Sequence, residues 1–357
     1  MDFVITASTL RRAAAPLAII GSLLALAAPS GAAPRSPLPP VHVRGTVYTF
    51  DNQEPIPGAT VRVVQFPGLS ATTGPDGTYD LAVPDGREIT LYAEAAGHHA
   101  LHTQTFVTHG RDLEHVNHQD PTTGTYHALA GLMSVQLDAN DNPTECVVVS
   151  TFSTMNVRDV SFQQFVDYGA HGVAGATAYA TPSLPSPVYF NESVIPDRTR
   201  TESSVDGGVI WTHVPAGTYR FHGQSPNTRF ASFRADCEPG RVVNANPPQG
   251  LYELRPGEAV DSTVDAKLAK PRVNRKGSSL KAKVKGGEYV SAVGDLFKGR
   301  KRIAHRDPGI YLPGAQTLNY RLGEKLAGRK LRLVVTLTDP EGNTKVLRRK
   351  VRVPVRR

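Results

Sequence analysis

The residues with the most chemistry to offer form a run of histidines before the middle of the chain. Seven of the 12 histidines of this 357-residue protein lie between His98 and His127, among aspartate and glutamate residues. Neutral imidazoles and carboxylates are ligands for zinc and copper. The run has no cysteine ligand and no established metal-site spacing, so we predict no metal and no cofactor. If a metal were bound, the candidate ligands would be His109, His115 and His118.

Motifs that would indicate catalysis are missing from the sequence. It has no nucleophile elbow, no HExxH zinc motif, no Walker loop and no GxGxxG turn before a helix. Asp76 and Asp206 each sit beside a glycine, but one carboxylate per turn is too few for a calcium loop. We therefore predict that the protein is not an enzyme.

Charge divides the chain into an acidic part and a basic part. Residues 1–266 have a formal charge of −11 and contain no lysine, whereas residues 267–357 have a formal charge of +19. A shift of this size at one point in the chain marks a domain boundary.

Two dense basic groups in the C-terminal part are the strongest candidates for binding. They comprise Lys298, Arg300, Lys301 and Arg302, followed by Arg348, Arg349, Lys350 and Arg352. Such groups create a positive potential that holds polyanions in a salt-dependent manner. We predict binding to a polyanionic cell-wall or extracellular polymer and no specific recognition of nucleic acid, because no nucleic-acid-binding helix motif is present. The alternative is a solvated surface whose lysines protect strand edges from aggregation.

The alternative hypothesis for function is a metal-binding or carbohydrate-binding accessory module of an extracellular enzyme system. Trp211 and Tyr189 are the candidate platforms for stacking on a sugar. Trp211 alternates with Val209 in an expected strand, which favours a core position.

The N-terminus has the pattern of a secretory signal. Arg11 and Arg12 precede an apolar run from Ala13 to Pro29, and small residues follow up to Ala33. The run is shorter than the roughly 20 residues that span a bilayer. We therefore predict a signal peptide over residues 1–33, a secreted or cell-envelope location, no transmembrane segment in the mature chain, and contact with a protein partner at the cell surface.

The two cysteines agree with export. Cys146 and Cys237 are an even number in a chain bound for an oxidising compartment, so one disulfide is expected. The alternative is a pair of buried free thiols.

Short alternating strands bounded by turn residues must position all of these groups. The stretch from Pro55 to Gly86 contains two such strands, Ala59–Val63 and Tyr79–Val83, with the turn Pro75-Asp76-Gly77 before the second. Residues 160–168 have the apolar spacing of one short helix. The fold class predicted from this pattern is all-β.

Residues 41–107 resemble a known family. Gly45, the phrases at 57–61 and 73–79, Val83-Pro84 and the closing 95–98 are similar to the carboxypeptidase regulatory-like, or transthyretin-like, domain. The resemblance implies a seven-stranded β-sandwich that acts as a spacer, an adhesive or an accessory module. The zinc HxxE pair of the associated carboxypeptidase is absent from this sequence.

The same phrase returns later in the chain. Residues 172–179 and 201–217 repeat the two halves of the first copy, with a 13-residue insertion around residues 182–191. We predict a second, divergent transthyretin-like sandwich in which Cys146 and Cys237 join the two ends.

The basic C-terminal part has its own strand pattern. Four alternating runs, at 279–284, 289–293, 331–338 and 346–353, predict strands. The turn Asp339–Asn343 joins the last two runs as a hairpin. It resembles the immunoglobulin-like or fibronectin-like modules at the C-termini of actinobacterial exported proteins.

The predicted organisation is a series of tandem β-sandwiches after a signal peptide. The ranges are a signal peptide at 1–33, a Pro-rich leader at 34–40, a carboxypeptidase regulatory-like sandwich at 41–107, a His-rich connecting segment at 108–144, a second transthyretin-like sandwich at 145–256, a linker at 257–270 and a basic immunoglobulin-like domain at 271–357.

Overall fold

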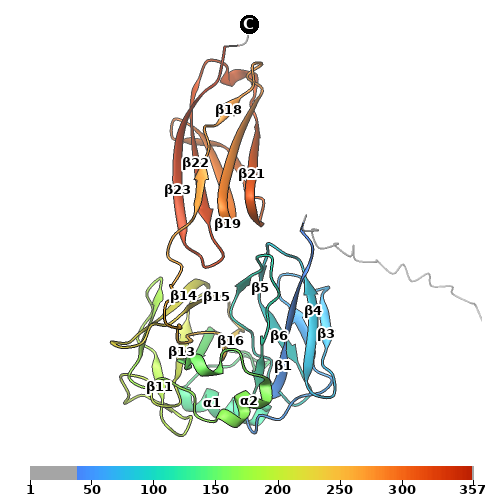
Figure 1. Cartoon of the computed structure of the whole chain (residues 1–357), viewed down its shortest axis with the longest axis vertical. Coiled ribbons are helices and arrows are strands. Elements are labelled where there is room, and N and C mark those ends of the chain that lie inside the picture. The colour runs from blue at the N-terminus through green and yellow to red at the C-terminus, as the bar shows by residue number, and fades with distance from the viewer. Residues whose placement is uncertain (1–37, 356–357) are drawn as a thin grey trace, which may run out of the picture. The chain divides into compact units, whose positions relative to one another are not determined.

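The structure is a computed structural model that describes residues 38–355. The predicted signal peptide, residues 1–33, lies outside the described residues. Strands make up about 46% of the structure and helices about 8%, and the strands form sandwich-like sheets (Figure 1), so the all-β prediction is confirmed. None of the helices within residues 38–355 is long and apolar enough to cross a membrane.

Strands β1 to β8, here called the N-terminal sheets, form two small sheets and a pair. β1 lies between β4, which is antiparallel to it, and β8, which is parallel to it. β2 pairs with β3 and β6, and β5 pairs with β7. The bounds are β1 (Val41–Thr49), β2 (Thr60–Val63), β3 (Ser70–Thr72), β4 (Thr78–Val83), β5 (Glu88–Ile89), β6 (Leu91–Glu94), β7 (Phe106–Val107) and β8 (His118–Asp120).

The two larger N-terminal sheets share one core. Along β2 and β4, buried residues alternate with more exposed ones, so each strand turns one face toward that core. Val43, Val61, Leu81 and Leu91 are buried in that core, one from each of four strands. Gly45 in β1 is required by a close approach, since a Cβ there would lie 2.0 Å from the carbonyl oxygen of Val116. The strand β8 shows that the segment 108–144 contributes to the sheet around β1.

Strands β9 to β16, here called the central sheets, form a five-stranded and a three-stranded sheet. The five-stranded order is β12-β11-β13-β9-β16, and the three-stranded order is β10-β14-β15. The bounds are β9 (Cys146–Thr151), β10 (Thr177–Thr181), β11 (Val188–Phe190), β12 (Pro196–Asp197), β13 (Gly208–Val214), β14 (Gly217–Gln224), β15 (Ser232–Cys237) and β16 (Val242–Ala245).

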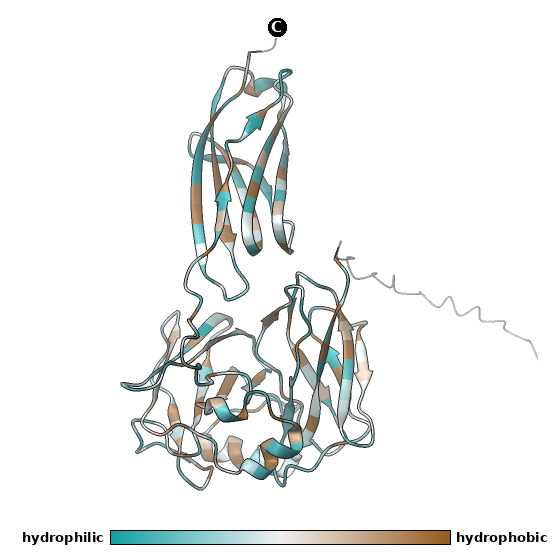
Figure 2. Cartoon of the chain, viewed as in Figure 1, coloured by the Kyte–Doolittle hydropathy of each residue, from teal (hydrophilic) through white to brown (hydrophobic). Residues whose placement is uncertain are grey.

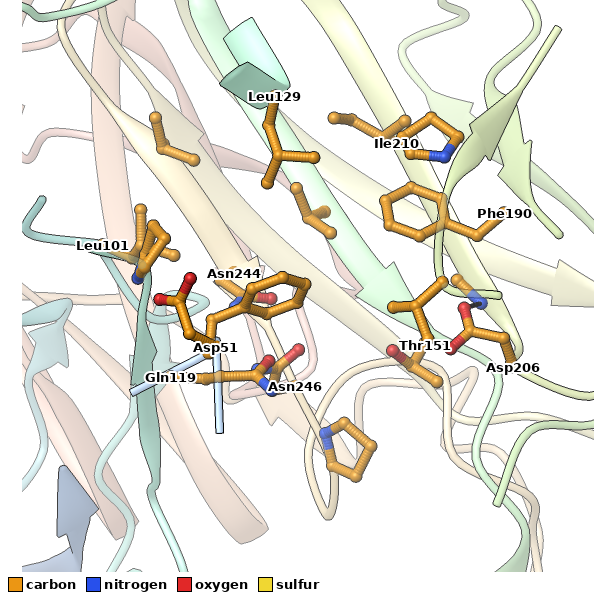
Figure 3. Close-up of a pocket in the computed structure, with 18 of the residues that line it drawn as sticks. Asp51, Leu101, Gln119, Leu129, Thr151, Phe190, Asp206, Ile210, Asn244 and Asn246 are labelled. Carbon is orange, nitrogen blue, oxygen red and sulfur yellow. Dashed lines mark hydrogen bonds between the residues drawn. The ribbon is translucent and has the colours of Figure 1, made fainter. Parts of the chain in front are cut away.

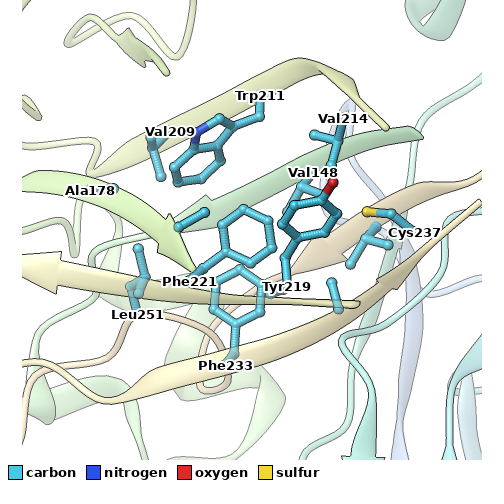
Figure 4. Packing of buried hydrophobic residues seen from close by; sticks show 14 of the residues in the cluster. Val148, Ala178, Val209, Trp211, Val214, Tyr219, Phe221, Phe233, Cys237 and Leu251 are labelled. Carbon is cyan, nitrogen blue, oxygen red and sulfur yellow. The ribbon is translucent and has the colours of Figure 1, made fainter. Parts of the chain in front are cut away.

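Aromatic rings fill the space between the two central sheets (Figure 4). The ring of Phe221 on β14 lies 4.8 Å from that of Trp211 on β13 and 4.9 Å from that of Phe233 on β15. Aromatic pairs at this spacing add stabilisation to the burial of their surface. Trp211 is therefore a core residue.

Two α-helices accompany the central sheets. α2 (Phe162–Tyr168) begins with a capping box made by Ser161 and Gln164, and it confirms the helix predicted over residues 160–168. α1 (Thr123–Met133) was not predicted; the side chain of Thr122 caps it by accepting from the backbone N–H of Thr125. Short 3₁₀ turns occur at Met155–Val157 and Glu324–Leu326.

Strands β17 to β23 form the C-terminal sheet, which is organised around one long strand. β19 pairs with β21 along its first half and with β20 and β22 along its second half, and β22 pairs with β23. The sequence pattern suggested two strands here, at 279–284 and 289–293. The bounds are β17 (Ala266–Leu268), β18 (Arg272–Val273), β19 (Ser279–Lys298), β20 (Lys301–Arg306), β21 (Tyr311–Arg321), β22 (Lys330–Thr338) and β23 (Thr344–Arg352).

The long strands of the C-terminal sheet alternate between apolar and polar residues. Along β22, residues 330–333 read Lys-Leu-Arg-Leu and alternate between exposed and buried positions, and brown and teal positions are mixed along the strands of this sheet in Figure 2. The apolar positions of β19 and β22, including Leu296, Leu333 and Val335, make the core of this part. The polar positions are left on the opposite face.

We predict that Phe221→Ala destabilises the central sheets by about 3–5 kcal/mol, because it removes a fully buried ring and leaves a cavity. Trp211 is the single tryptophan of the chain, so urea unfolding followed by tryptophan fluorescence reports on this core. The matched control is Tyr179→Ala, whose side chain is 50% exposed and whose loss should cost less than about 1 kcal/mol. Equal shifts for the two variants would contradict the packing described.

Candidate binding sites

A cavity of about 540 Å³ lies on the face of the five-stranded sheet that points away from the aromatic core (Figure 3). Every residue of β9 is buried or half-buried, so both faces of this strand are covered. The three-stranded sheet covers one face, and α1 together with loops of the N-terminal sheets covers the other. The cavity is the space that this second cover leaves open.

Apolar side chains form most of the cavity wall. They come from the sheet, from both helices and from the N-terminal segments, and they comprise Leu101, Leu129, Met133, Val147, Val149, Phe165, Phe190, Ile210 and Val242. In Figure 3 Leu129, Phe190 and Ile210 lie along one side of the space.

Three amide side chains converge at another part of the wall. Asn244 and Asn246 are two residues apart around the end of β16, and the amide of Asn246 donates to the side-chain oxygen of Gln119 on β8. The Oδ1 atom of Asn244 is buried without a hydrogen-bond partner in the described part of the chain, and so is the hydroxyl of Tyr126. Burying a polar atom without a partner costs about 1–3 kcal/mol.

Three carboxylates, those of Asp51, Glu192 and Asp206, also line the cavity. Burial alone would raise the pKa of Asp51, but hydrogen bonds from Thr125, Thr122 and Thr49 outweigh it and the pKa is lowered. Asp206 belongs to the Asp-Gly turn before β13. Burial raises the pKa of its carboxyl group, and the hydrogen bond from the backbone N–H of Gly208, at 3.0 Å, and the nearby His171 offset only part of this rise.

The C-terminal sheet carries a second candidate, here called the basic face. Buried Leu331 and Leu333 face the core, so the residues between them point outward on β22. Strand pairing places Lys350 of β23 beside Arg332, and Phe297 of β19 lies between Arg332 and Arg302 of β20. The basic face comprises Lys330, Arg332, Arg348, Lys350, Arg352 and Arg302.

The basic face contains few partners for its cations. The guanidinium of Arg332 lies 4.7 Å from the ring centre of Phe297, and Arg302 is 3.3 Å from a carboxylate oxygen of Asp295. β20, β22 and β23 contain no acidic residue. The positive charge of these three strands is therefore left largely uncompensated, with Asp295 of the intervening β19 as the acidic partner of Arg302.

The structure divides the predicted polyanion-binding residues among three places. Arg302, Arg348, Lys350 and Arg352 lie on the basic face. Lys298, Arg300 and Lys301 are exposed at the turn between β19 and β20, and Arg349 pairs with Leu333, which places it toward the opposite side of the edge strand. Sequence reasoning missed Lys330 and Arg332, whose alternation with Leu331 and Leu333 was the available signal.

The structure separates the histidines named as metal candidates. His109 hydrogen-bonds through Nδ1 with the carbonyl oxygen of Val107 at 2.8 Å, His115 adopts a positive φ of 56°, and His118 is buried on β8. Among the described residues, the one group of three possible ligands within 4.8 Å comprises Asp261, Glu288 and Asp339. Both carboxylate oxygens of Asp339 already accept from Asn343.

The predicted disulfide is not formed in the structure. Cys146, at the start of β9, and Cys237, at the end of β15, are buried free thiols, and the Sγ of Cys146 donates to the carbonyl oxygen of Val147 at 3.8 Å. The neighbouring Cys146 thiol and burial raise the pKa of the Cys237 thiol, which therefore stays protonated in the core. The expectation was wrong because an even cysteine count gives no information on bonding between two apposed thiols.

The two candidate platforms for sugar stacking are also inside the fold. Trp211 and Tyr189 are each 4% exposed and belong to the aromatic core, and the hydroxyl of Tyr189 accepts from the backbone N–H of Ala178. Neither ring presents a face to solvent.

Comparison with known proteins does not define a family. No family model and no curated protein matches the chain. A structure of the Bacillus anthracis TIE protein is 10% identical with a TM-score of 0.19, and the match covers 89% of this chain and 49% of that one. The chain thus spans about half the length of the TIE protein.

Two further structures give matches of the same kind. A tetra-tandem repeat from the extending region of a large adhesion protein is 12% identical, covers 88% of this chain and 74% of its own, and has a TM-score of 0.22. The major pilin subunit BcpA of Bacillus cereus is 10% identical, covers 59% and 69%, and has a TM-score of 0.17. These low scores leave the transthyretin-like resemblance of residues 41–107 a prediction.

We predict that Cys146 and Cys237 do not react with a thiol reagent such as dithionitrobenzoate while the protein is folded, because their side chains are 0% and 2% exposed. In urea two thiols per chain should react. The same chain after prior reduction serves as the control for the count. An absence of reactive thiols in urea without reduction would contradict the free-thiol state.

Buried histidines predict that the fold loses stability in acid. Burial lowers the pKa of His99 and His102 to about 4 and that of His118 to about 3. The unfolded chain takes up protons near pH 6.5, whereas the folded chain stays neutral at these positions, so stability falls as the pH drops from about 6.5 toward 3–4.

Replacing His118 by leucine should remove its share of this pH dependence. Between pH 7 and pH 5 the variant should lose about 2 kcal/mol less unfolding free energy than the parent chain. Urea unfolding followed by circular dichroism at both pH values measures the difference. An equal loss in the two proteins would contradict the neutral state of buried His118.

Proposed function

We propose that this protein is an exported, non-catalytic binding protein whose basic face holds a polyanionic polymer of the cell wall or extracellular space. The observation that carries the proposal is the alignment of Arg302, Arg332 and Lys350 in one row across β20, β19, β22 and β23. Phe297 on β19 completes the row.

The spacing of these charges suits a polymer better than a single small anion. Neighbouring strands lie about 4.8 Å apart, and alternate residues of one strand about 6.8 Å apart. Both spacings are shorter than the screening length of about 8–10 Å at ordinary ionic strength, so the potentials of the cations add. Arginine also presents a planar fork of donors that matches phosphate and carboxylate oxygens.

The sign of the remaining charge supports a binding role confined to this part of the molecule. Residues 1–266 carry a formal charge of −11 and so repel the polymer that residues 267–357, at +19, attract. The apolar N-terminal pattern supports export, which would give the basic face access to such polymers.

Charge reversal at the centre of the face tests the proposal. The double variant Arg332→Glu/Lys350→Glu should be retained at least about tenfold less on isolated cell walls and on immobilised polyphosphate at about 0.1 M salt, because it removes the two central cations. The parent chain should be released from both matrices at about 1 M salt, where the screening length falls to about 3 Å.

The control variant is Lys267→Glu/Lys285→Glu, which changes the net charge equally at two exposed positions that pair between β17 and the first half of β19, away from Phe297 and the basic face. It should keep most of the retention. Equal losses for the two double variants would show that net charge alone acts, and retention of the parent chain at about 1 M salt would exclude an electrostatic site.

A further inference from the structure

The cavity above the five-stranded sheet is independent of the basic face. We propose that it is a binding site for a neutral, largely apolar small molecule with one hydrogen-bonding head group. Its volume of about 540 Å³ falls within the range of about 300–1,000 Å³ that small-molecule sites occupy.

The cavity is a local feature and not a sign of loose packing. On the other face of the same strands, Val148 and Val209 are fully buried in a core of interlocking aromatic rings. Protein interiors leave few voids larger than a water molecule. The space therefore results from how α1 and the loops of the N-terminal sheets pack on the five-stranded sheet, and not from loose packing of the domain.

The apolar wall selects the body of the ligand. Val149 and Ile210 line the cavity from the sheet, and Leu129 and Met133 line it from α1. These aliphatic chains have no polar atom to offer, and burying apolar surface against them gives about 25 cal/mol for each Å² removed from water. A ring system or short hydrocarbon meets this requirement better than a sugar with hydroxyls on every side.

The unpartnered polar atoms select the head group. The Oδ1 atom of Asn244 is a buried acceptor, and the hydroxyl of Tyr126 both donates and accepts; neither has a partner within residues 38–355. In Figure 3 Asn244 lies beside Gln119 and Asn246. Both atoms are covered in the structure, so a ligand hydroxyl, amine or amide N–H reaches the oxygen of Asn244 when this side chain turns toward the space, and the bond then removes the cost of the orphaned oxygen.

The charges around the cavity argue against an anionic ligand. Asp51, Asp206 and Glu192 line it, and His171 is the single basic side chain among the lining residues. Glu192 is exposed and paired with Arg200 at 3.1 Å. Asp51 and the half-buried Asp206, however, have no cationic Lys or Arg partner among the lining residues, so a carboxylate or sulfonate head would meet like charge there. The preferred ligand is therefore neutral.

A pair of fluorescent probes with the same ring skeleton tests this inference on the full chain. N-phenylnaphthylamine is neutral and apolar and has one N–H donor, whereas anilinonaphthalene sulfonate adds a sulfonate to the same skeleton. The first probe should bind saturably at one molecule per chain, and the second at least about tenfold more weakly, because of the lining carboxylates.

Filling the cavity should abolish binding of the neutral probe. Val149→Phe fills it from the sheet and Leu129→Trp from the helix, so binding should fall at least about tenfold in both. Variants of two different walls are used so that the test stands if one of them fails to fold, and near-ultraviolet circular dichroism shows which variants are folded. The control Val346→Phe makes the same change at a side chain that is 44% exposed on β23 and should leave binding unchanged.

Asn244→Leu tests the head group separately. It removes the orphaned acceptor at similar volume, so affinity for N-phenylnaphthylamine should fall about three- to tenfold. The inference is overturned if the neutral probe does not bind saturably, if a folded cavity-filling variant binds it as well as the parent chain, or if the sulfonated probe binds equally well. These outcomes do not depend on retention by polyanions.

Discussion

The burial of the five-stranded sheet on both faces is the constraint on which the rest of the structure depends. β9 reads Cys-Val-Val-Val-Ser-Thr, an apolar run with no solvent face. Such a strand needs a cover on each side, as in sheets that are enclosed by two layers. The three-stranded sheet supplies one cover, and the chain must bring the other from segments that precede β9.

The second cover links the central and N-terminal sheets. Backbone hydrogen bonds join His102 to Val242 and Asn244 at 2.8 and 2.7 Å, which places a segment of the N-terminal part directly beside β16. Arg234 on β15 makes a two-pronged ion pair with Glu88 on β5 at 2.7 and 2.9 Å. Because these contacts fix the cover in place, the space it leaves open has a defined wall.

Much of the fold follows from the alternation of residues in the sequence, but α1 and the cavity do not. The run that forms α1 contains Gly124 and Gly131, two poor helix formers, and its helix is stabilised by burying Tyr126, Ala130 and Met133 against the sheet. That is tertiary stabilisation, which local propensity cannot indicate. The cavity draws on many separate segments, each of which looks like ordinary strand or loop.

The basic face was partly predictable because charge density is visible in sequence. Arg348, Lys350 and Arg352 were found by their clustering, whereas Arg332 stands alone between leucines and joins them only through strand pairing. Register decides which cations share a face, and it is fixed by long-range pairing. The cysteine prediction failed for a related reason. Packing between the two central sheets decides where Cys146 and Cys237 lie, and an even number of cysteines in the sequence does not show whether they are bonded.

Parallel pairing of β9 with β16 has a consequence for the order of folding. Val147 lies opposite Val242 in this ladder, so one edge of β9 has no partner until the chain has been made as far as residue 245. Non-local pairing of this kind folds slowly. In the interval an apolar strand with a free edge is exposed to other chains, which makes β9 a segment prone to aggregation during synthesis.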